Sequence, residues 1–114
     1  MAEVRIINNR IDDQFEAIVG GDLLGGTLKY QLLRESDEVK GKVINAYHTK
    51  VAPEFSGYGI GSKLARTMIE FAKDEGYKIL PTCPFIESYL EKHPEYAALQ
   101  IEFDNVNDDT ESEV

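Results

Sequence analysis

Apolar and polar residues alternate, or apolar residues follow one another in short runs, through the first half of the chain. This pattern is typical of β-strands and occurs in four segments, at residues 4–7, 14–19, 27–33 and 42–51. Turn-forming residues separate the segments at 8–9, 20–22 and 41. Because short connections usually join strands that lie side by side, we predict an antiparallel meander of about four strands.

The second half of the chain has a helical period. Residues 59–75 place one set of apolar side chains on a single helix face: Ile60, Leu64, Met68, Phe71 and Ala72. Gly76 is a suitable residue to end this helix. Residues 77–80 then predict a short buried strand, which a right-handed crossover would set parallel to 42–51. Pro84 predicts the start of a second helix that ends before Pro94, so the fold class is α+β.

Three alternating glycines, Gly57, Gly59 and Gly61, lead from the fourth strand into the first helix. Glycine lets the backbone turn tightly and lie against a ligand with no Cβ in the way. The first N–H groups of a helix lack intrahelical partners, and the helix dipole favours negative charge there. The pattern indicates a phosphate-binding loop; the alternative is a glycine-rich surface turn that binds nothing.

Two common phosphate-binding motifs do not fit this loop. A P-loop requires Gly-Lys-Ser or Gly-Lys-Thr, whereas Gly61 is followed by Ser62 and Lys63. A dinucleotide-binding loop requires its third glycine where Ser62 stands, and an acidic residue at the end of the following strand. Here Asp74 and Glu75 lie on the tail of the predicted helix instead.

The stretch from Val51 through Pro53 to Gly61 resembles the pyrophosphate loop of the GNAT N-acetyltransferase superfamily. In that family a strand ending in Val-x-Pro precedes a Gln/Arg-x-x-Gly-x-Gly/Ala motif. Ser56 stands where the family usually has Gln or Arg, so one contact to the cofactor is weakened or absent. His48-Thr49, residues 81–85 and residues 89–96 extend the resemblance to very small single-domain GNAT-like proteins.

The resemblance implies that the chain binds acetyl-CoA, a small-molecule acyl donor. Backbone groups of residues 49–51 would pair with the pantetheine arm, and the glycine loop would hold the pyrophosphate. The cofactor-binding residues would be Thr49, Lys50, Val51, Ser56, Gly57, Tyr58, Gly59, Ile60, Gly61 and Ser62.

The resemblance also implies a compact GNAT-like fold with reduced N-terminal helices. Family members carry one or two helices between their first two strands, and these help to form the acceptor groove. Here only residues 8–13 separate the two strands. The acyl acceptor, an amine or a protein, would therefore meet an open surface or the neighbouring subunit of a homodimer.

Three residues are candidates for the chemistry. Cys83 precedes Pro84 at a helix start, where the dipole favours a thiolate; the alternative is a buried apolar cysteine. His48 could act as its base if the two strands are neighbours, or could be a polar residue hydrogen-bonded within a strand. Tyr89 matches the position of the family's general acid, which protonates the departing thiolate, or it is a tyrosine that covers the sheet.

The net charge of −9 is concentrated towards the C-terminal end. Residues 102–114 contain acidic residues and neither lysine nor arginine. Such a segment cannot bury enough apolar surface to offset its ordering entropy. We expect residues 1–103 to form one acetyl-CoA-binding domain and residues 104–114 to form an acidic disordered tail.

Composition excludes several function classes. No apolar run is long enough to span a membrane, and no basic stripe suggests nucleic-acid binding. One cysteine and two histidines at these spacings form no recognisable metal site, and a lone cysteine without a signal peptide predicts a cytoplasmic protein. Three functions remain: an acetyl-CoA-dependent acyltransferase, a CoA or acyl-CoA binding module with little turnover, and a small interaction domain.

Overall fold

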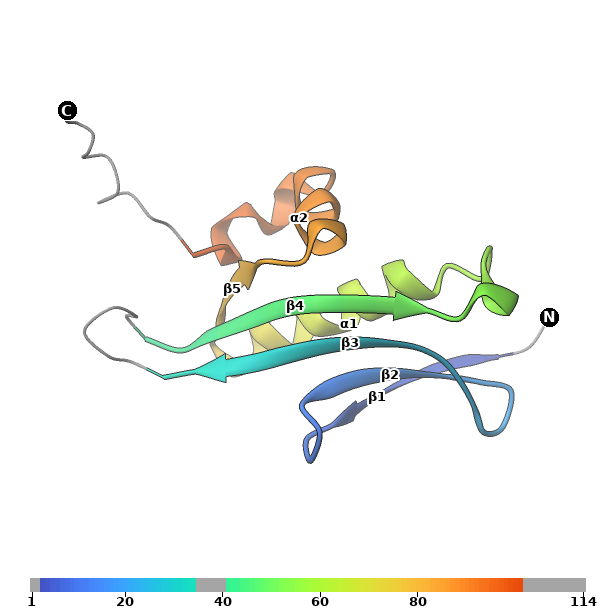
Figure 1. Cartoon of the computed structure of the whole chain (residues 1–114). Helices are drawn as coiled ribbons and strands as arrows, with labels where there is room; N and C mark the ends of the chain where they lie inside the picture. The colour runs from blue at the N-terminus through green and yellow to red at the C-terminus, as the bar shows by residue number, and fades with distance from the viewer. Residues whose placement is uncertain (1–2, 35–40, 102–114) are drawn as a thin grey trace.

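The computed structural model of the chain describes residues 3–34 and 41–101, which form one mixed β-sheet with two α-helices (Figure 1). The strands are β1 (Val4–Asn9), β2 (Gln14–Val19), β3 (Leu23–Leu33), β4 (Val43–Val51) and β5 (Lys78–Pro81). The helices are α1 (Ile60–Glu75) and α2 (Pro84–Glu91), with 3₁₀ turns η1 (Pro53–Phe55) and η2 (Pro94–Leu99).

The strands lie in chain order from β1 to β5, as the short connections predicted. The first four are antiparallel neighbours, and β5 pairs with β4 in parallel after the crossover helix α1. The α+β fold class, the four-stranded meander and the parallel fifth strand are therefore confirmed. The four residues 10–13 that join β1 to β2 form a turn, so the expected reduction of the N-terminal helices is confirmed as well.

The strand β3 begins at Leu23, earlier than the predicted residue 27. Gly25 and Gly26 have poor strand propensity, yet both belong to β3, and the packing there leaves no room for a side chain. A Cβ on Gly25 would lie 2.6 Å from Val19 Cγ2, and one on Gly26 would lie 2.8 Å from the Lys50 carbonyl oxygen. This close approach of neighbouring strands is a tertiary feature that propensity does not predict.

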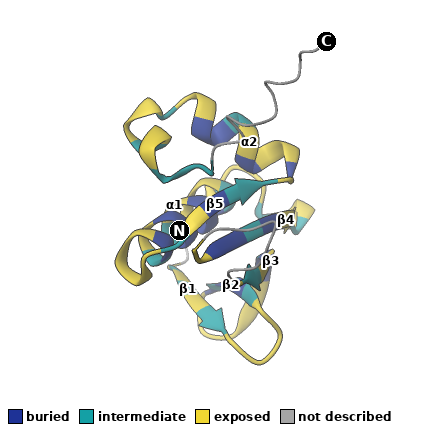
Figure 2. Ribbon diagram, turned by 90° about the vertical axis from the view of Figure 1, so that its left-hand side faces the viewer, coloured by how far each residue is buried: buried dark blue, intermediate teal, exposed yellow. Residues whose placement is uncertain are grey.

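The core lies between one face of the sheet and α1, whose apolar stripe follows the predicted spacing. The strands contribute Phe15, Ala17, Val19, Leu28, Tyr30, Ile44 and Ala46, and α1 contributes Ile60, Leu64, Ala65, Met68, Ile69 and Ala72. Seen along the strands, α1 covers one side of the sheet and α2 lies beyond β5 (Figure 2). The side of the sheet opposite α1 is called the open face here. In β2 the residues that point to this side are only partly buried, so no helix covers the open face there.

The acidic tail that we predicted at residues 104–114, and the domain boundary at residue 103, lie outside the described residues. Within the described ranges, no helix is long and apolar enough to cross a membrane.

Candidate functional site

The strands β4 and β5 separate half-way along β4, which leaves an open edge (Figure 1). Their pairing runs from Val43 opposite Lys78 to Ala46 opposite Pro81, and the last hydrogen bond between their backbones is the Cys83 N–H donating to the Ala46 carbonyl at 3.0 Å. The strand β4 then continues to Val51, paired with β3 only. Beyond Ala46 this edge of β4 has no strand partner among the described residues, and we call the region between this edge and the start of α2 the gap.

A β-bulge decides which groups of β4 face the gap. The register between β3 and β4 shifts at Tyr47, because Lys29 lies opposite His48 whereas Tyr30 lies opposite Ala46. Backbone groups alternate between the two edges of a strand, and a bulge reverses the alternation. The Ala52 N–H donates to Gly25 of β3 at 2.8 Å, so the backbone groups of residues 49 and 51 point the other way, into the gap.

The loop between β4 and α1 presents a row of backbone N–H groups without backbone acceptors in the described part of the chain. They belong to Gly57, Gly59, Ile60, Gly61 and Ser62. No side chain caps the helix, since the N-cap residue is Gly59 itself. These unpaired donors and the positive end of the helix dipole form an anion cradle.

The three glycines of the loop have different roles. Gly57 and Gly59 have φ values of 91° and 73°, which favour glycine, and a Cβ on either would point into open space. Gly61 is helical, and a Cβ there would lie 2.9 Å from the Phe85 ring. Gly61 therefore lets the start of α2 pack against the start of α1, while Gly57 and Gly59 shape the cradle.

Two basic side chains beside the cradle were not identified from the sequence. A cavity of about 400 Å³ adjoins Gly59 and Ser62, and Lys63 and Arg66 line it. On the sequence they are ordinary polar positions of an amphipathic helix. Their place in the first turns after a glycine loop is the signal that could have indicated an anion site.

Cys83 lies at the N-cap of α2 and is 5% exposed. Its Sγ is 3.5 Å from the Thr49 hydroxyl oxygen, at the inner end of the gap. Burial raises the pKa of the thiol, but the Thr49 hydroxyl and the backbone N–H groups of Ile86, Phe85 and Thr49 outweigh burial, so the pKa lies below its ordinary value. The helix-start environment predicted for this cysteine is therefore present.

His48 is not brought to Cys83. The two strands are neighbours through the Ala46 contact, but successive side chains of a strand point to opposite faces. Because Thr49 faces Cys83, His48 points to the open face, where it is exposed. The prediction that His48 is the base for Cys83 assumed that side chains on neighbouring segments meet. The alternation of side chains along β4 separates these two instead.

Tyr89 is 7% exposed on α2 and lies among aromatic rings. Its ring stacks on that of His93 at 4.1 Å between centroids, and His93 Nδ1 is 2.8 Å from the Tyr89 carbonyl oxygen. His93 thus has a structural contact at the end of α2. No hydrogen bond joins the Tyr89 hydroxyl to another described residue, which leaves the hydroxyl available as a proton donor.

Comparison with known proteins agrees with this geometry. The GCN5-related N-acetyltransferase family matches residues 14–99. The chain is 27% identical to protein NATD1 of Xenopus tropicalis over 93 residues, covering 82% of the chain and 80% of that protein. It is 25% identical to human protein NATD1 over 91 residues, covering 80% of the chain and 75% of that protein.

Two solved structures share the fold. A GCN5-like proposed N-acetyltransferase from Staphylococcus aureus superposes with a TM-score of 0.62 at 24% identity, covering 94% of this chain and 99% of that chain. A proposed acetyl transferase from Pyrococcus furiosus gives a TM-score of 0.55 at 29% identity, covering 70% of this chain and 56% of that chain. Because the family match spans residues 14–99, which is most of the chain, the chain belongs to the GCN5-related N-acetyltransferase family.

Proposed function

We propose that the chain is an acetyl-CoA-dependent N-acetyltransferase with an open acceptor site. Membership of the family supports a general acyltransferase role. The observation that carries the more specific proposal is the set of unpaired N–H groups of Gly57, Gly59, Ile60, Gly61 and Ser62, which follows the open edge of β4. A cradle for a pyrophosphate and an edge for an extended amide-containing arm are the two features that CoA requires.

The residues present fit the acyl donor. The pyrophosphate would accept hydrogen bonds from the N–H groups of Gly57, Gly59 and Gly61, with Lys63 and Arg66 adding positive charge at the adjoining cavity. The amides of the pantetheine arm would pair with the backbone groups that face the gap. Ser56 can add only a neutral hydroxyl where the family usually has a longer side chain, so we expect moderate affinity for CoA.

The thioester of acetyl-CoA supplies an activated acyl carbon. The thiolate of Cys83 would attack this carbon, forming a new carbon–sulfur bond while the bond to the CoA sulfur breaks. Tyr89 would give its proton to the departing thiolate and recover one from solvent. An incoming amine would then form the amide bond, releasing the Cys83 thiolate and one proton to solvent.

A CoA-binding module with little turnover is the second candidate. The short turn between β1 and β2 favours this second candidate. Residues 10–13 contain no helix that could form the side of an acceptor groove. In that case CoA would bind as proposed, but the acyl group would stay on the donor or on Cys83.

Mass spectrometry of the protein with acetyl-CoA tests the proposal. Native conditions should show a non-covalent complex, and denaturing conditions should show one added acetyl group. The variant Cys83→Ala should lose the covalent adduct and keep the complex. A wild-type protein that forms no complex with acetyl-CoA at millimolar concentration would contradict the proposal, and a complex that gives neither an adduct nor an acetylated amine would leave the binding module as the function.

A further inference from the structure

The acyl carbon would be reached from the open face, because the helix side of the gap is closed. The Phe85 ring lies over Gly61 and joins the starts of the two helices, and Ile86 is fully buried beneath them. An acceptor therefore has to approach across the open face of β3 and β4. This direction of approach rests on the proposed function.

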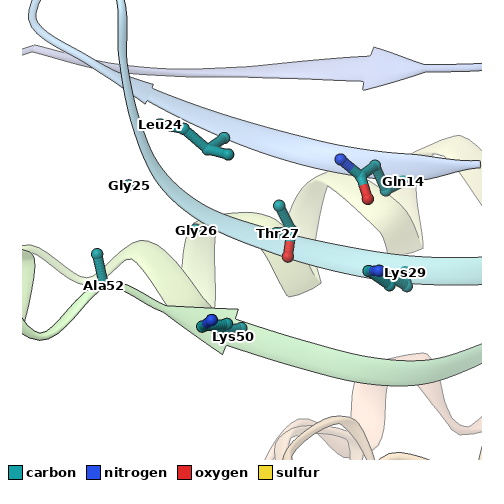
Figure 3. Close-up of a pocket in the computed structure, with 8 residues that line it drawn as sticks. All are labelled: Gln14, Leu24, Gly25, Gly26, Thr27, Lys29, Lys50 and Ala52. Carbon is teal, nitrogen blue, oxygen red and sulfur yellow. The ribbon is translucent and has the colours of Figure 1, made fainter. Parts of the chain in front are cut away.

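The open face carries a pocket of about 410 Å³ beside the end of β4 (Figure 3). It is lined by Gln14, Leu24, Gly25, Gly26, Thr27, Lys29, Lys50 and Ala52. Added Cβ atoms on both glycines would contact Ile60 of α1, so neither position points a side chain towards the open face. The pocket exists because β3 presents no side chain there between Leu24 and Thr27.

Lys29 and Lys50 give this pocket a positive charge. Both side chains extend from the near side of the sheet in Figure 3, while α1 lies behind it. The backbone carbonyls of Glu75 and Ala98 accept hydrogen bonds from Lys42 and Lys78, at 2.8 and 2.7 Å. No such partner among the described residues binds Lys29 or Lys50.

One acid lies beside the two lysines. Glu16 is on the same face opposite Thr27, and its Oε2 accepts hydrogen bonds from the Asn9 and Gln14 side chains at 2.9 and 2.6 Å. Two lysines against one flanking carboxylate leave the pocket with a net positive charge, which an anion from outside the chain would stabilise.

We propose that this pocket binds an anionic group of the acyl acceptor, so that the preferred acceptor is a small amine that also carries a carboxylate or a phosphate. The Thr27 hydroxyl supplies a neutral donor beside the two ammonium groups. The pocket volume suits a molecule of amino-acid size better than a long peptide. The anion would hold the acceptor while its amine reaches across β4 to the gap.

Binding without any acyl donor gives the first test. Butyrate, inorganic phosphate and butylamine are titrated separately into ¹⁵N-labelled protein at low salt. We expect butyrate or phosphate to shift the amide signals of residues 24–29 and 50–52, and butylamine to leave them unchanged. The double variant Lys29→Gln/Lys50→Gln should lose the response, whereas Lys73→Gln/Lys92→Gln, which removes the same charge from exposed helix positions, should keep it.

Acceptor preference gives the second test, with 4-aminobutyrate, butylamine and 1,4-diaminobutane compared at fixed acetyl-CoA. We expect kcat/KM for 4-aminobutyrate to exceed that for butylamine by roughly tenfold, which two exposed ion pairs allow. In Lys29→Gln/Lys50→Gln, kcat/KM for 4-aminobutyrate should fall to the value for butylamine. Anion binding at the pocket in a protein that does not bind acetyl-CoA would refute the proposed function and keep the anion site. Equal rates for the three amines, or butyrate and phosphate responses that the lysine variant retains, would overturn the inference.

Discussion

Two alanine variants, Gly59→Ala and Gly76→Ala, distinguish an effect on ligand binding from an effect of backbone strain. The two glycines stand at opposite ends of α1 in almost the same conformation, with φ and ψ of 73° and 24° at Gly59 and of 77° and 30° at Gly76. A Cβ on either would have no protein atom within 4 Å. Each substitution should therefore cost the same strain, about 1–2 kcal/mol for an L-residue in the left-handed region.

Their effects on CoA should differ. At Gly59 the new methyl group would occupy the space in front of the unpaired N–H groups. Loss of one hydrogen bond to a charged phosphate costs about 1.5–3 kcal/mol, so Kd for CoA should rise roughly tenfold or more. At Gly76 the methyl group lies at the far end of the helix, and Kd should not change.

Thermal unfolding and calorimetric titration with CoA measure the two effects. Both variants should lose a similar amount of stability. In a domain of this size, each kcal/mol of lost stability lowers Tm by roughly 4–8 °C. If the two alanine variants bind CoA equally well, the N-terminal end of α1 is not the phosphate cradle. If only Gly59→Ala is destabilised, the strain argument is wrong.

Three further predictions follow from the same contacts. The rate at which iodoacetamide alkylates Cys83 should rise with a pH midpoint below that of free cysteine, and CoA should protect the thiol. Because the folded state loses the thiol proton at lower pH than the unfolded state, the free energy of unfolding should rise with pH between the folded and unfolded thiol pKa values. Cys83→Ala should lack this rise, and its absence in the wild type would contradict the lowered pKa. Tyr89→Phe should keep CoA affinity and lower kcat by roughly 100-fold, and an unchanged kcat would remove the tyrosine from the mechanism. Gly26→Ala should destabilise the fold by about 1–3 kcal/mol through its contacts with the Lys50 carbonyl oxygen and Ile60, and a Tm equal to that of the wild type would show that the strands can separate at low cost.

Most of the fold could be predicted because local signals agreed with one another. The alternation in β2 and the spacing of Ile60, Leu64 and Met68 in α1 define which faces are buried, and short turns define the neighbours. The glycine loop was recognisable because its donors belong to the helix start itself. Cys83 could be placed at a helix start because Pro84 follows it.

What could not be predicted depends on contacts between distant segments. From the sequence, Gly25 and Gly26 resemble a turn. Their place in a strand is explained by Val19 and the Lys50 carbonyl oxygen, which lie too close to them for a side chain. The bulge at Tyr47 reverses which residues face the gap, so Thr49 and not His48 contacts Cys83. The bulge is defined by the pairing of β4 with β3, so the sequence of β4 read alone gives no signal for it.

The central claim is that CoA binds along the open edge of β4 and on the cradle at the start of α1. Amide signals of ¹⁵N-labelled wild-type protein, recorded as CoA is added to millimolar concentration, test this claim most directly. The account predicts saturable changes at residues 49–51 and 57–62, with residues 24–29 of the open face and the distant end of α1 unaffected. An absence of change at millimolar CoA, or changes confined to other parts of the chain, would contradict it.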